Sequence, residues 1–319
     1  IMAAQAQKKK RKFSWTRDDT ELTLLSLPTT VWYILFSFLP MFGIVMAFKD
    51  YKVTAPDRSF FYNLLLSDNA GFDNFKFLFQ TGGMWNVIKL TLLYNIVFQI
   101  LGILVPVTLA LLMSQLYSKR YGKICQTCMF FPYFMSWVVV TYFVFAFLSP
   151  DNGLINKILE SLGYETVNWY MEPKYWPVFL IFLNTWKGMG YGMVVYLATI
   201  TGIDATMYEA ALIDGATKWQ QTRYITLPHL KNIIIMMFIL NIGSLVRSDF
   251  GLFYQVPKAS ASLTPVTNTI DVYIYNALKT QFSPNMSSAA AFLQSVVGCI
   301  LILLSNFIIS KIDADSAII

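Results

Sequence analysis

Residues 208–230 read YEAALIDGATKWQQTRYITLPHL, and they separate two long apolar stretches at 177–200 and 233–254. The alanines in the first half of this segment favour a short helix. Gly215 suits a left-handed turn at the end of that helix, which a residue with a side chain adopts less easily. Pro228 ends or bends the second helical piece. The segment therefore predicts a helical loop between two apolar helices.

The composition of the whole chain is typical of a membrane protein. Of its 319 residues, 56% are hydrophobic and 13% are charged, and the mean hydropathy is +0.52. Soluble globular proteins carry about 25% charged residues, so this chain has too little charge to cover a water-soluble particle. Its 26 Phe, 18 Tyr and 8 Trp also exclude a disordered chain. A soluble enzyme is excluded on the first ground, and we expect an all-α protein with several membrane spans.

Six stretches are long and apolar enough to cross a bilayer, which takes about 20 residues per helix. They are residues 28–48, 86–113, 124–148, 177–200, 233–254 and 289–309. Prolines inside these spans are compatible with a bundle, because neighbouring helices can satisfy the carbonyls that a proline frees. Three glycines in the fourth span predict close helix packing there, and they are Gly188, Gly190 and Gly192.

Lysine and arginine gather on one side of the predicted spans, which orients the chain. They occur in the cluster Lys8–Lys12, in the turn 113–124, in the loop 202–232 and at Lys311. The first span is too long for a signal peptide and no cleavage site follows it, so we expect an uncleaved anchor and both termini in the cytoplasm. The predicted organisation is a basic cytoplasmic arm 1–27, a first span 28–48, an external loop 49–85, a core 86–311 with five spans and the loop 202–232, and a cytoplasmic tail 312–319.

The cysteines and the histidine predict no metal site. The three cysteines are Cys125, Cys128 and Cys299, and the one histidine is His229. A Cys-x-x-Cys pair can be a redox or metal pair, but within an apolar stretch two small apolar side chains of a membrane helix are the simpler interpretation. One histidine and one such pair cannot make a structural zinc site. We predict no catalytic residues and no disulfide framework.

Five polar residues inside the predicted spans are candidates for a transport path. Lys187 lies in the fourth span, and Arg247 and Asp249 lie in the outer part of the fifth. A charge at such depth costs at least about 2.5–3.5 kcal/mol, so these side chains face a cavity or one another. One alternative is a structural Arg–Asp pair or a lysine bound to a carbonyl. The other is that they line a transport path with Asn184 and Asn241, and two cations against one acid would then suit an acidic sugar such as a uronate.

The loop contains, in order, Glu209-Ala210-Ala211, Asp214-Gly215-Ala216, Trp219 and Leu227-Pro228. This order resembles the signature loop of permease subunits of ABC importers, and its extended form is similar to the carbohydrate branch. Residues 33–40, 247–254, 271–275 and 311–317 and the basic arm resemble the complex-polysaccharide (lipo-oligosaccharide) branch, so the resemblance covers essentially the whole chain. One departure is Asn232, where many relatives have a proline.

The resemblance implies a fold, a set of partners and a location. The fold is the type I ABC importer permease fold, with six transmembrane helices in the bacterial cytoplasmic membrane. The partners are a second homologous permease, two ATP-binding subunits and an external sugar-binding protein that delivers an oligosaccharide. The loop residues Glu209, Ala210, Ala211, Asp214, Gly215 and Ala216 would form the coupling helix that docks on one ATPase.

The chain itself contains no G-x-x-x-x-G-K-[ST] phosphate loop. We therefore expect ATP and Mg to be bound by the partner subunits, and no cofactor in this chain. We expect membrane lipid around the spans and no nucleic acid. Two alternatives stay open, a secondary transporter and a non-transporting membrane scaffold or sensor. The Glu-Ala-Ala loop has no role in the first, and the second predicts no polar residues facing an internal cavity.

Overall fold

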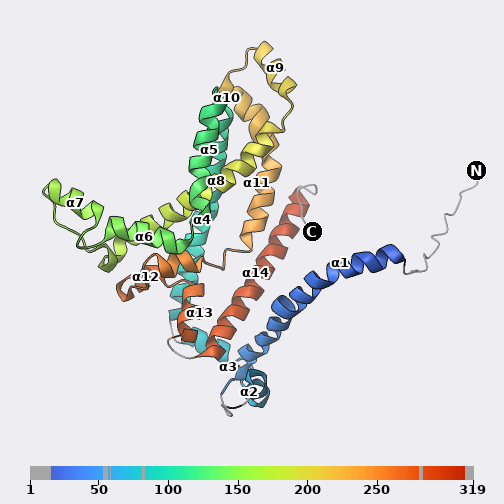
Figure 1. Cartoon of the computed structure of the whole chain (residues 1–319), viewed down its shortest axis with the longest axis vertical. Helices are drawn as coiled ribbons and strands as arrows, with labels where there is room; N and C mark the ends of the chain where they lie inside the picture. Colours follow the sequence, from blue (N-terminus) through green and yellow to red (C-terminus); the bar gives the residue numbers. More distant parts are fainter. Residues whose placement is uncertain (1–15, 53–56, 58, 81–82, 280–282, 313–319) are drawn as a thin grey trace, which may run out of the picture. The chain divides into compact units, whose positions relative to one another are not determined.

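The computed structural model describes residues 16–52, 57, 59–80, 83–279 and 283–312 (Figure 1). Within these ranges the regular elements are helices, apart from a short antiparallel pair of strands, β1 (Lys49–Asp50) and β2 (Asp68–Asn69). Among the described residues, five helices are long and apolar enough to cross a membrane, and the number is six if the bent pair α5 and α6 counts as one span. The predicted all-α membrane protein is thus confirmed. The cluster Lys8–Lys12 and residues 313–319 of the predicted tail lie outside the described residues.

Residues up to Val45 form one compact unit and residues from Met46 form another, and each is described by itself. In the first unit, α1 (Arg17–Tyr33), η1 (Ile34–Phe38) and the first part of η2 (Leu39–Phe48) follow one another without a gap. The helix begins at Arg17, inside the predicted arm 1–27, because Thr16 and Asp19 each accept a hydrogen bond from the other's backbone N–H. No side chain of α1 is buried within the chain.

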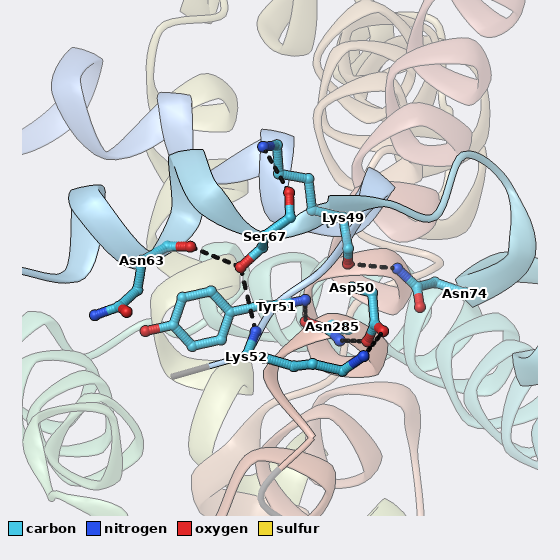
Figure 2. A network of polar contacts seen from close by, with 8 residues as sticks. All are labelled: Lys49, Asp50, Tyr51, Lys52, Asn63, Ser67, Asn74 and Asn285. Carbon is cyan, nitrogen blue, oxygen red and sulfur yellow. Dashed lines mark hydrogen bonds and ion pairs between the residues drawn. The ribbon is translucent and has the colours of Figure 1, made fainter. Parts of the chain in front are cut away.

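A polar network holds the segment that follows the first helix (Figure 2). The ammonium group of Lys49 donates hydrogen bonds of 3.0 Å to the carbonyls of Leu65 and Ser67, at the end of α2 (Phe60–Leu66). Lysine is favourable there because the last carbonyls of a helix have no partner within it. The network therefore fixes the direction in which α2 leaves the strand pair.

The same network ties this segment to two further helices. Asn74 on α3 (Asp73–Gln80) donates to the carbonyl of Lys49 at 3.0 Å. Asn285 in the first turn of α14 (Pro284–Ile312) accepts from the backbone N–H of Tyr51 at 3.0 Å and donates to Asp50 at 3.3 Å. The start of the last long helix is thus fixed against a segment more than two hundred residues earlier in the chain.

The second unit is built around α4 (Gly83–Ser114) and α8 (Trp176–Thr201), which pack along each other. These two helices and α14 coincide within a few residues with the predicted spans 86–113, 177–200 and 289–309. A methyl group at Gly190 on α8 would collide with the backbone carbonyl of Met129 on α5, so close packing is confirmed at Gly190. At Gly188 no atom lies within 4 Å of such a methyl group, so the expectation is wrong there.

The third predicted span is broken. Instead of one helix over 124–148, the chain forms α5 (Lys119–Phe134) and α6 (Trp137–Leu148), whose axes differ by 102°. α5 ends two residues after Pro132, and α6 begins at a new N-cap, where the Ser136 hydroxyl accepts a bond from the N–H of Val139. The hydrophobicity of the stretch is continuous, so it does not reveal this break.

The fifth predicted span, 233–254, is also interrupted. α10 (Lys218–Gln221), η5 (Thr222–Thr226) and α11 (Leu227–Ile242) form one run that stops at Ile242. Residues 243–249 follow without a regular helix, and helical structure resumes at Phe250 and continues in η6 (Gly251–Gln255). Arg247 and Asp249 therefore lie in a helix break rather than on a helix face.

The remaining elements lie at the two ends of these long helices. α9 (Ala205–Ile213) lies at the end where α4 finishes, and α12 (Thr264–Thr267) and α13 (Ile270–Lys279) lie at the other end (Figure 1). The connections between α6 and α8 and between η6 and α12 contain the shorter helices α7 (Leu154–Ser161), η3 (Trp169–Met171), η4 (Pro173–Tyr175) and η7 (Ala261–Leu263).

Candidate functional site: a polar cavity at a helix break

A cavity of about 420 Å³ lies beside the break that follows α11. Four of the five predicted path residues line it, and they are Asn184, Asn241, Arg247 and Asp249. The other lining residues come from α4 and from the break itself, and they are Asn95, Phe98, Gln99, Gly102, Ser244, Leu245 and Ser248. We call this the Arg247 cavity. Its walls combine side-chain amides with one cation and one carboxylate.

Side-chain amides from other helices hold the break open. Asn95 on α4 donates to the carbonyls of Leu245 at 2.8 Å and Arg247 at 2.6 Å. Gln294 on α14 donates to the carbonyl of Val246 at 2.9 Å. Backbone carbonyls without a partner are costly in a membrane, so these amides replace the bonds that a continuous helix would have made.

A second group of contacts fixes the next residue of the break. Ser248 donates to the carboxylate of Asp271 on α13, through its N–H at 2.5 Å and through its hydroxyl at 2.9 Å. The same carboxylate accepts a bond of 3.1 Å from Gln294, which is buried. Asp271 is thus surrounded by hydrogen-bond donors, and these bonds compensate for the cost of removing its carboxylate from water between apolar helices.

Asp249 starts the helical segment on the far side of the break. One of its carboxylate oxygens accepts bonds from the N–H groups of Gly251 at 2.8 Å and Leu252 at 3.3 Å. The other accepts a 2.5 Å bond from the indole N–H of Trp137, the first residue of α6. Both oxygens are therefore occupied by donors of the chain itself, as in an N-cap.

Arg247 differs from Asp249 in this respect. Its side chain is exposed and lines the cavity, while its backbone carbonyl is held by Asn95. Among the residues that the structure describes, no carboxylate pairs with its guanidinium group and no acceptor hydrogen-bonds to it. A predicted Arg–Asp pair is therefore not formed, and the cavity contains a cation whose five donors are available.

Lys187 does not line the Arg247 cavity. Its ammonium group donates a 3.0 Å bond to the carbonyl of Tyr133, in the last turn of α5. It also lies 5.6 Å from the ring centroid of Tyr133 and 5.3 Å from that of Trp137. This is the lysine–carbonyl arrangement that the sequence left open as the structural alternative, and it supplies a partner to a carbonyl freed by the bend between α5 and α6.

The loop with the Glu-Ala-Ala motif forms a capped helix at the opposite end of the unit. The carboxylate of Asp204 accepts a 3.0 Å bond from the N–H of Thr206, and this bond holds the pKa of Asp204 below its usual range. A lowered pKa means that the charged form stabilises the start of α9 at neutral pH. That contribution is lost as the pH falls through the lowered pKa.

The other end of α9 is closed by Gly215, whose φ is +77°. The N–H of Ala216 donates to the carbonyl of Ala211 at 2.8 Å, and that of Gly215 donates to Leu212 at 3.1 Å. These two bonds define a Schellman motif, which needs a left-handed residue at Gly215. No atom lies within 4 Å of a methyl group built at this position, so the constraint comes from the backbone and not from crowding within the chain.

α9 presents an apolar and acidic surface that no described residue of its own unit covers. No residue of α9 is buried, and Leu212 and Ile213 are 69% and 87% exposed. Glu209 is exposed too, and within the described ranges its carboxylate has no hydrogen-bond or ion-pair partner. A bond of 2.9 Å between the hydroxyls of Tyr208 and Thr226 joins α9 to η5, so the loop is attached to the helix run that leads to the Arg247 cavity.

Metal ligands are not gathered anywhere in the described part of the chain, where no group of three or more His, Cys, Asp or Glu residues could hold an ion. Cys125, Cys128 and Cys299 are free thiols.

Comparison with known proteins identifies the family. Residues 102–313 match the family described as "Binding-protein-dependent transport system inner membrane component". The chain belongs to this family. Protein LplB of Bacillus subtilis is 32% identical over 297 residues, which are 93% of this permease and 91% of LplB. The polygalacturonan/rhamnogalacturonan transport system permease protein YteP of the same species is 32% identical over 309 residues, 97% of this permease and 94% of YteP.

Two solved structures resemble the permease over nearly its whole length. One is of a bacterial ABC transporter involved in the import of the acidic polysaccharide alginate, with a TM-score of 0.81 and 30% identity over 93% of this chain and 97% of that chain. The other is of a bacterial alginate ABC transporter in complex with an alginate pentasaccharide-bound periplasmic protein, with a TM-score of 0.82 and 31% identity over 93% and 96%.

The permease is therefore a multi-span membrane subunit of a carbohydrate ABC importer with the type I permease fold. It is a transport subunit without catalytic activity of its own, and membership of this family excludes a secondary transporter and a scaffold.

From the sequence, we did not identify Asn95, Gln99, Trp137 or Gln294 as site residues. The signal was present, because three of them are amides inside apolar spans, where an amide needs a partner.

Proposed function

We propose that this subunit translocates a uronate-containing oligosaccharide, which an external solute-binding protein delivers, through the Arg247 cavity. It works with a second homologous permease and two ATP-binding subunits in the bacterial cytoplasmic membrane, with both termini in the cytoplasm. ATP and Mg are held by the ATP-binding subunits. Alternating access of the two permeases exposes the cavity first to the outside and then to the cytoplasm.

The proposal of an acidic substrate rests on one observation. The guanidinium group of Arg247 lies in a polar cavity and has no hydrogen-bond or ion-pair partner among the described residues. The donors of this exposed guanidinium group are available to a ligand in the cavity, and a substrate carboxylate would bind them through paired, directional bonds. Asp249 does not compete for it, because its oxygens already accept bonds from Trp137, Gly251 and Leu252. The names of YteP and of the alginate transporter, which concern acidic polysaccharides, support the same substrate class.

The neutral part of the substrate has partners in the same cavity. Asn184 and Asn241 line it, and within the described ranges their side-chain amides make no hydrogen bond. An amide offers both donors and an acceptor, so it can bind a sugar hydroxyl in either sense. Asn184 lies on α8 and Asn241 on α11, so movement of one helix against the other would change the cavity that the sugar occupies.

We assign coupling to the α9 loop, through Glu209, Ala210, Ala211, Asp214, Gly215 and Ala216. Its exposed apolar end and the free carboxylate of Glu209 suit a groove with a cationic rim on an ATP-binding subunit. The Tyr208–Thr226 bond and the unbroken run from α10 to α11 supply the mechanical connection to the cavity. Closure of the ATPase dimer would then move α11 against its neighbours.

The substrate is tested with Arg247→Gln in the complete complex, reconstituted with its binding protein. We expect the KM for a galacturonate oligosaccharide to rise about tenfold to a hundredfold, the effect of one charge-assisted hydrogen-bond pair, with little change in basal ATP hydrolysis. Arg17→Gln is the matched control, because Arg17 forms only an exposed pair with Glu21. Equal uptake of neutral oligosaccharides by the wild type, or an equal fall of uptake and ATP hydrolysis in Arg247→Gln, would overturn the proposal.

A further inference from the structure

A second, smaller cavity of about 270 Å³ is lined by residues of η6, of the connection that follows it, of α12 and of α13. Its floor is apolar and buried, with Phe253 and Val272. Tyr254 forms a wall, and the rim carries hydroxyl and amide side chains, namely Ser260, Thr264, Thr267, Asn268 and Asn276. We call it the Tyr254 cavity. None of the described residues that line it is charged, in contrast to the Arg247 cavity.

Part of this polar rim is already used by the fold, and part is not. Ser260 donates a 3.0 Å bond to the carbonyl of Tyr170, and Thr267 donates one of 3.0 Å to Leu263. The side chains of Thr264, Asn268 and Asn276 have no hydrogen-bond partner among the described residues. Together they offer one hydroxyl and two amides to whatever fills the cavity.

The Tyr254 wall is a rigid aromatic surface. Its ring stacks on Phe250, with centroids 4.7 Å apart and planes at 16°, and lies 4.9 Å from the ring of Tyr275 on α13. A stacked ring has little freedom to rotate, so its orientation is fixed before a ligand arrives. The C–H groups on the face of a pyranose ring can pack on a flat aromatic ring, and the hydroxyl groups around its edge can bond to neighbouring amides and hydroxyls.

A strained turn closes one side of the same cavity. Lys258 and Ala259 have φ values of 56° and 50°, in the left-handed region that residues with side chains seldom adopt. Two backbone hydrogen bonds hold the turn. The N–H of Ala259 donates to the backbone carbonyl of Tyr254 at 3.0 Å, and the N–H of Lys258 donates to the backbone carbonyl of Gln255 at 2.8 Å. Ala259 lines the cavity. Strain of this kind is concentrated at ligand clamps and other functional sites.

The two cavities have no lining residue in common, but the same two elements, η6 and α13, are connected to both. Asp249, which lines the Arg247 cavity, caps η6, and Phe253 and Tyr254 belong to that helix. On α13, Asp271 holds Ser248 of the first cavity, while Val272 and Asn276 line the second. α12 and α13, which contribute residues to the Tyr254 cavity, lie at the end of the unit opposite α9 (Figure 1), and this is the outer end if α9 docks on a cytoplasmic ATPase.

We infer that the Tyr254 cavity is an outer saccharide subsite, which takes an uncharged face of a sugar residue while a uronate of the same chain approaches Arg247. The inference rests on the proposed function, because it requires an oligosaccharide as substrate. It adds a dependence on chain length: a pentasaccharide reaches both cavities at once, whereas a disaccharide occupies the Arg247 cavity alone.

The test is uptake by the reconstituted complex of galacturonate oligosaccharides of two and five residues. Asn276→Leu removes the amide without shortening the side chain, and Thr264→Val removes the hydroxyl at constant shape. For each variant we expect the KM for the pentasaccharide to rise about fivefold, the loss of one neutral hydrogen bond, and the KM for the disaccharide to stay unchanged. Asn152→Leu is the control, at an exposed asparagine that lines neither cavity.

Equal changes for both lengths, or no change for either, in both variants would overturn the subsite. Failure of the wild-type complex to import either oligosaccharide would instead overturn the proposed function, so the two failures are distinguishable. A misfolded variant is recognised by a lower Tm of the purified complex, and Thr264→Val then carries the test because Thr264 is exposed and its hydroxyl makes no bond within the described residues.

Discussion

The indole N–H of Trp137 donates a 2.5 Å hydrogen bond to the carboxylate of Asp249, and so it joins the two helix breaks of the permease. Trp137 is the first residue after the bend between α5 and α6, and Asp249 is the residue that restarts the helix after α11. The same indole ring fills the space where Gly251 has no side chain. One tryptophan thus fixes the position of two segments that come from different spans.

Trp137→Phe should destabilise the permease while leaving most of the ring packing on Gly251. The lost bond is to a charged acceptor, so we expect a cost of about 1.5–3 kcal/mol in the free energy of unfolding. The measurement is the Tm of the purified complex. Trp85→Phe is the control, because Trp85 is exposed and packs on Phe79 without a hydrogen bond from its indole among the described residues. Equal Tm values for the two variants would contradict the prediction.

Lys187→Met should lower stability without weakening substrate binding. Methionine keeps the length of the side chain but cannot donate to the carbonyl of Tyr133. A freed carbonyl in an apolar environment costs about 1–3 kcal/mol, whereas the KM for an acidic oligosaccharide should stay within about twofold of the wild type, less than 0.5 kcal/mol. An increase in KM as large as that of Arg247→Gln would show that Lys187 contacts the substrate.

Gly190→Ala and Gly188→Ala form a matched pair two residues apart on α8. The added methyl group of Gly190→Ala meets the backbone of Met129, which cannot move aside as a side chain does, so the loss of stability should be at least about 1–3 kcal/mol. The methyl group of Gly188→Ala meets no atom, and alanine favours the helix by about 1 kcal/mol. Thermal unfolding should therefore shift in opposite directions, and a similar shift in both variants would refute the close contact of α5 and α8.

Gly215→Asp and Glu209→Lys should uncouple ATP hydrolysis from uptake in a complex that still assembles in the membrane. The first change puts a side chain on a residue with φ of +77°, at a cost of about 1–2 kcal/mol, and also places it on the proposed docking surface. The second reverses the charge of an exposed carboxylate. The ratio of sugar imported to ATP hydrolysed should fall, and wild-type ratios in both variants would remove coupling from this loop.

Much of the architecture could be predicted from hydrophobicity alone. The spans at α4, α8 and α14 are long apolar runs, and the α9 loop has alanines and a glycine whose local preferences agree with its structure. The bend at Ser136 could not be found in this way, because it lies within a continuous apolar stretch. The gap at 243–249 contains Arg247, Ser248 and Asp249, but polar residues inside a span do not by themselves indicate a break. Both breaks persist because distant side chains, Lys187, Asn95 and Gln294, supply bonds to the freed carbonyls.

The candidate site was predictable in part for the same reason. Arg247, Asn184 and Asn241 stand out as polar residues in apolar spans, and the structure brings them to one cavity with Asp249. Lys187 stands out equally, but it lies at the bend of another helix pair. Sequence gives the depth of such a residue along its span and not the direction of its side chain, which depends on contacts between helices far apart in the chain.

The support of the 243–249 segment also has a consequence for membrane insertion. The carbonyl of Val246 accepts its bond from Gln294, and the N–H of Ser248 donates to Asp271. The ribosome makes both partners after this segment. Until α13 and α14 arrive, these groups have only water or a continuing helix to bind. Asn95 is made earlier and can already hold the carbonyls of Leu245 and Arg247, whereas the remaining bonds form only with the last two helices, so the finished cavity is among the last features of the permease to form. The shape of the cavity would therefore depend on the order in which the helices insert as well as on the local sequence.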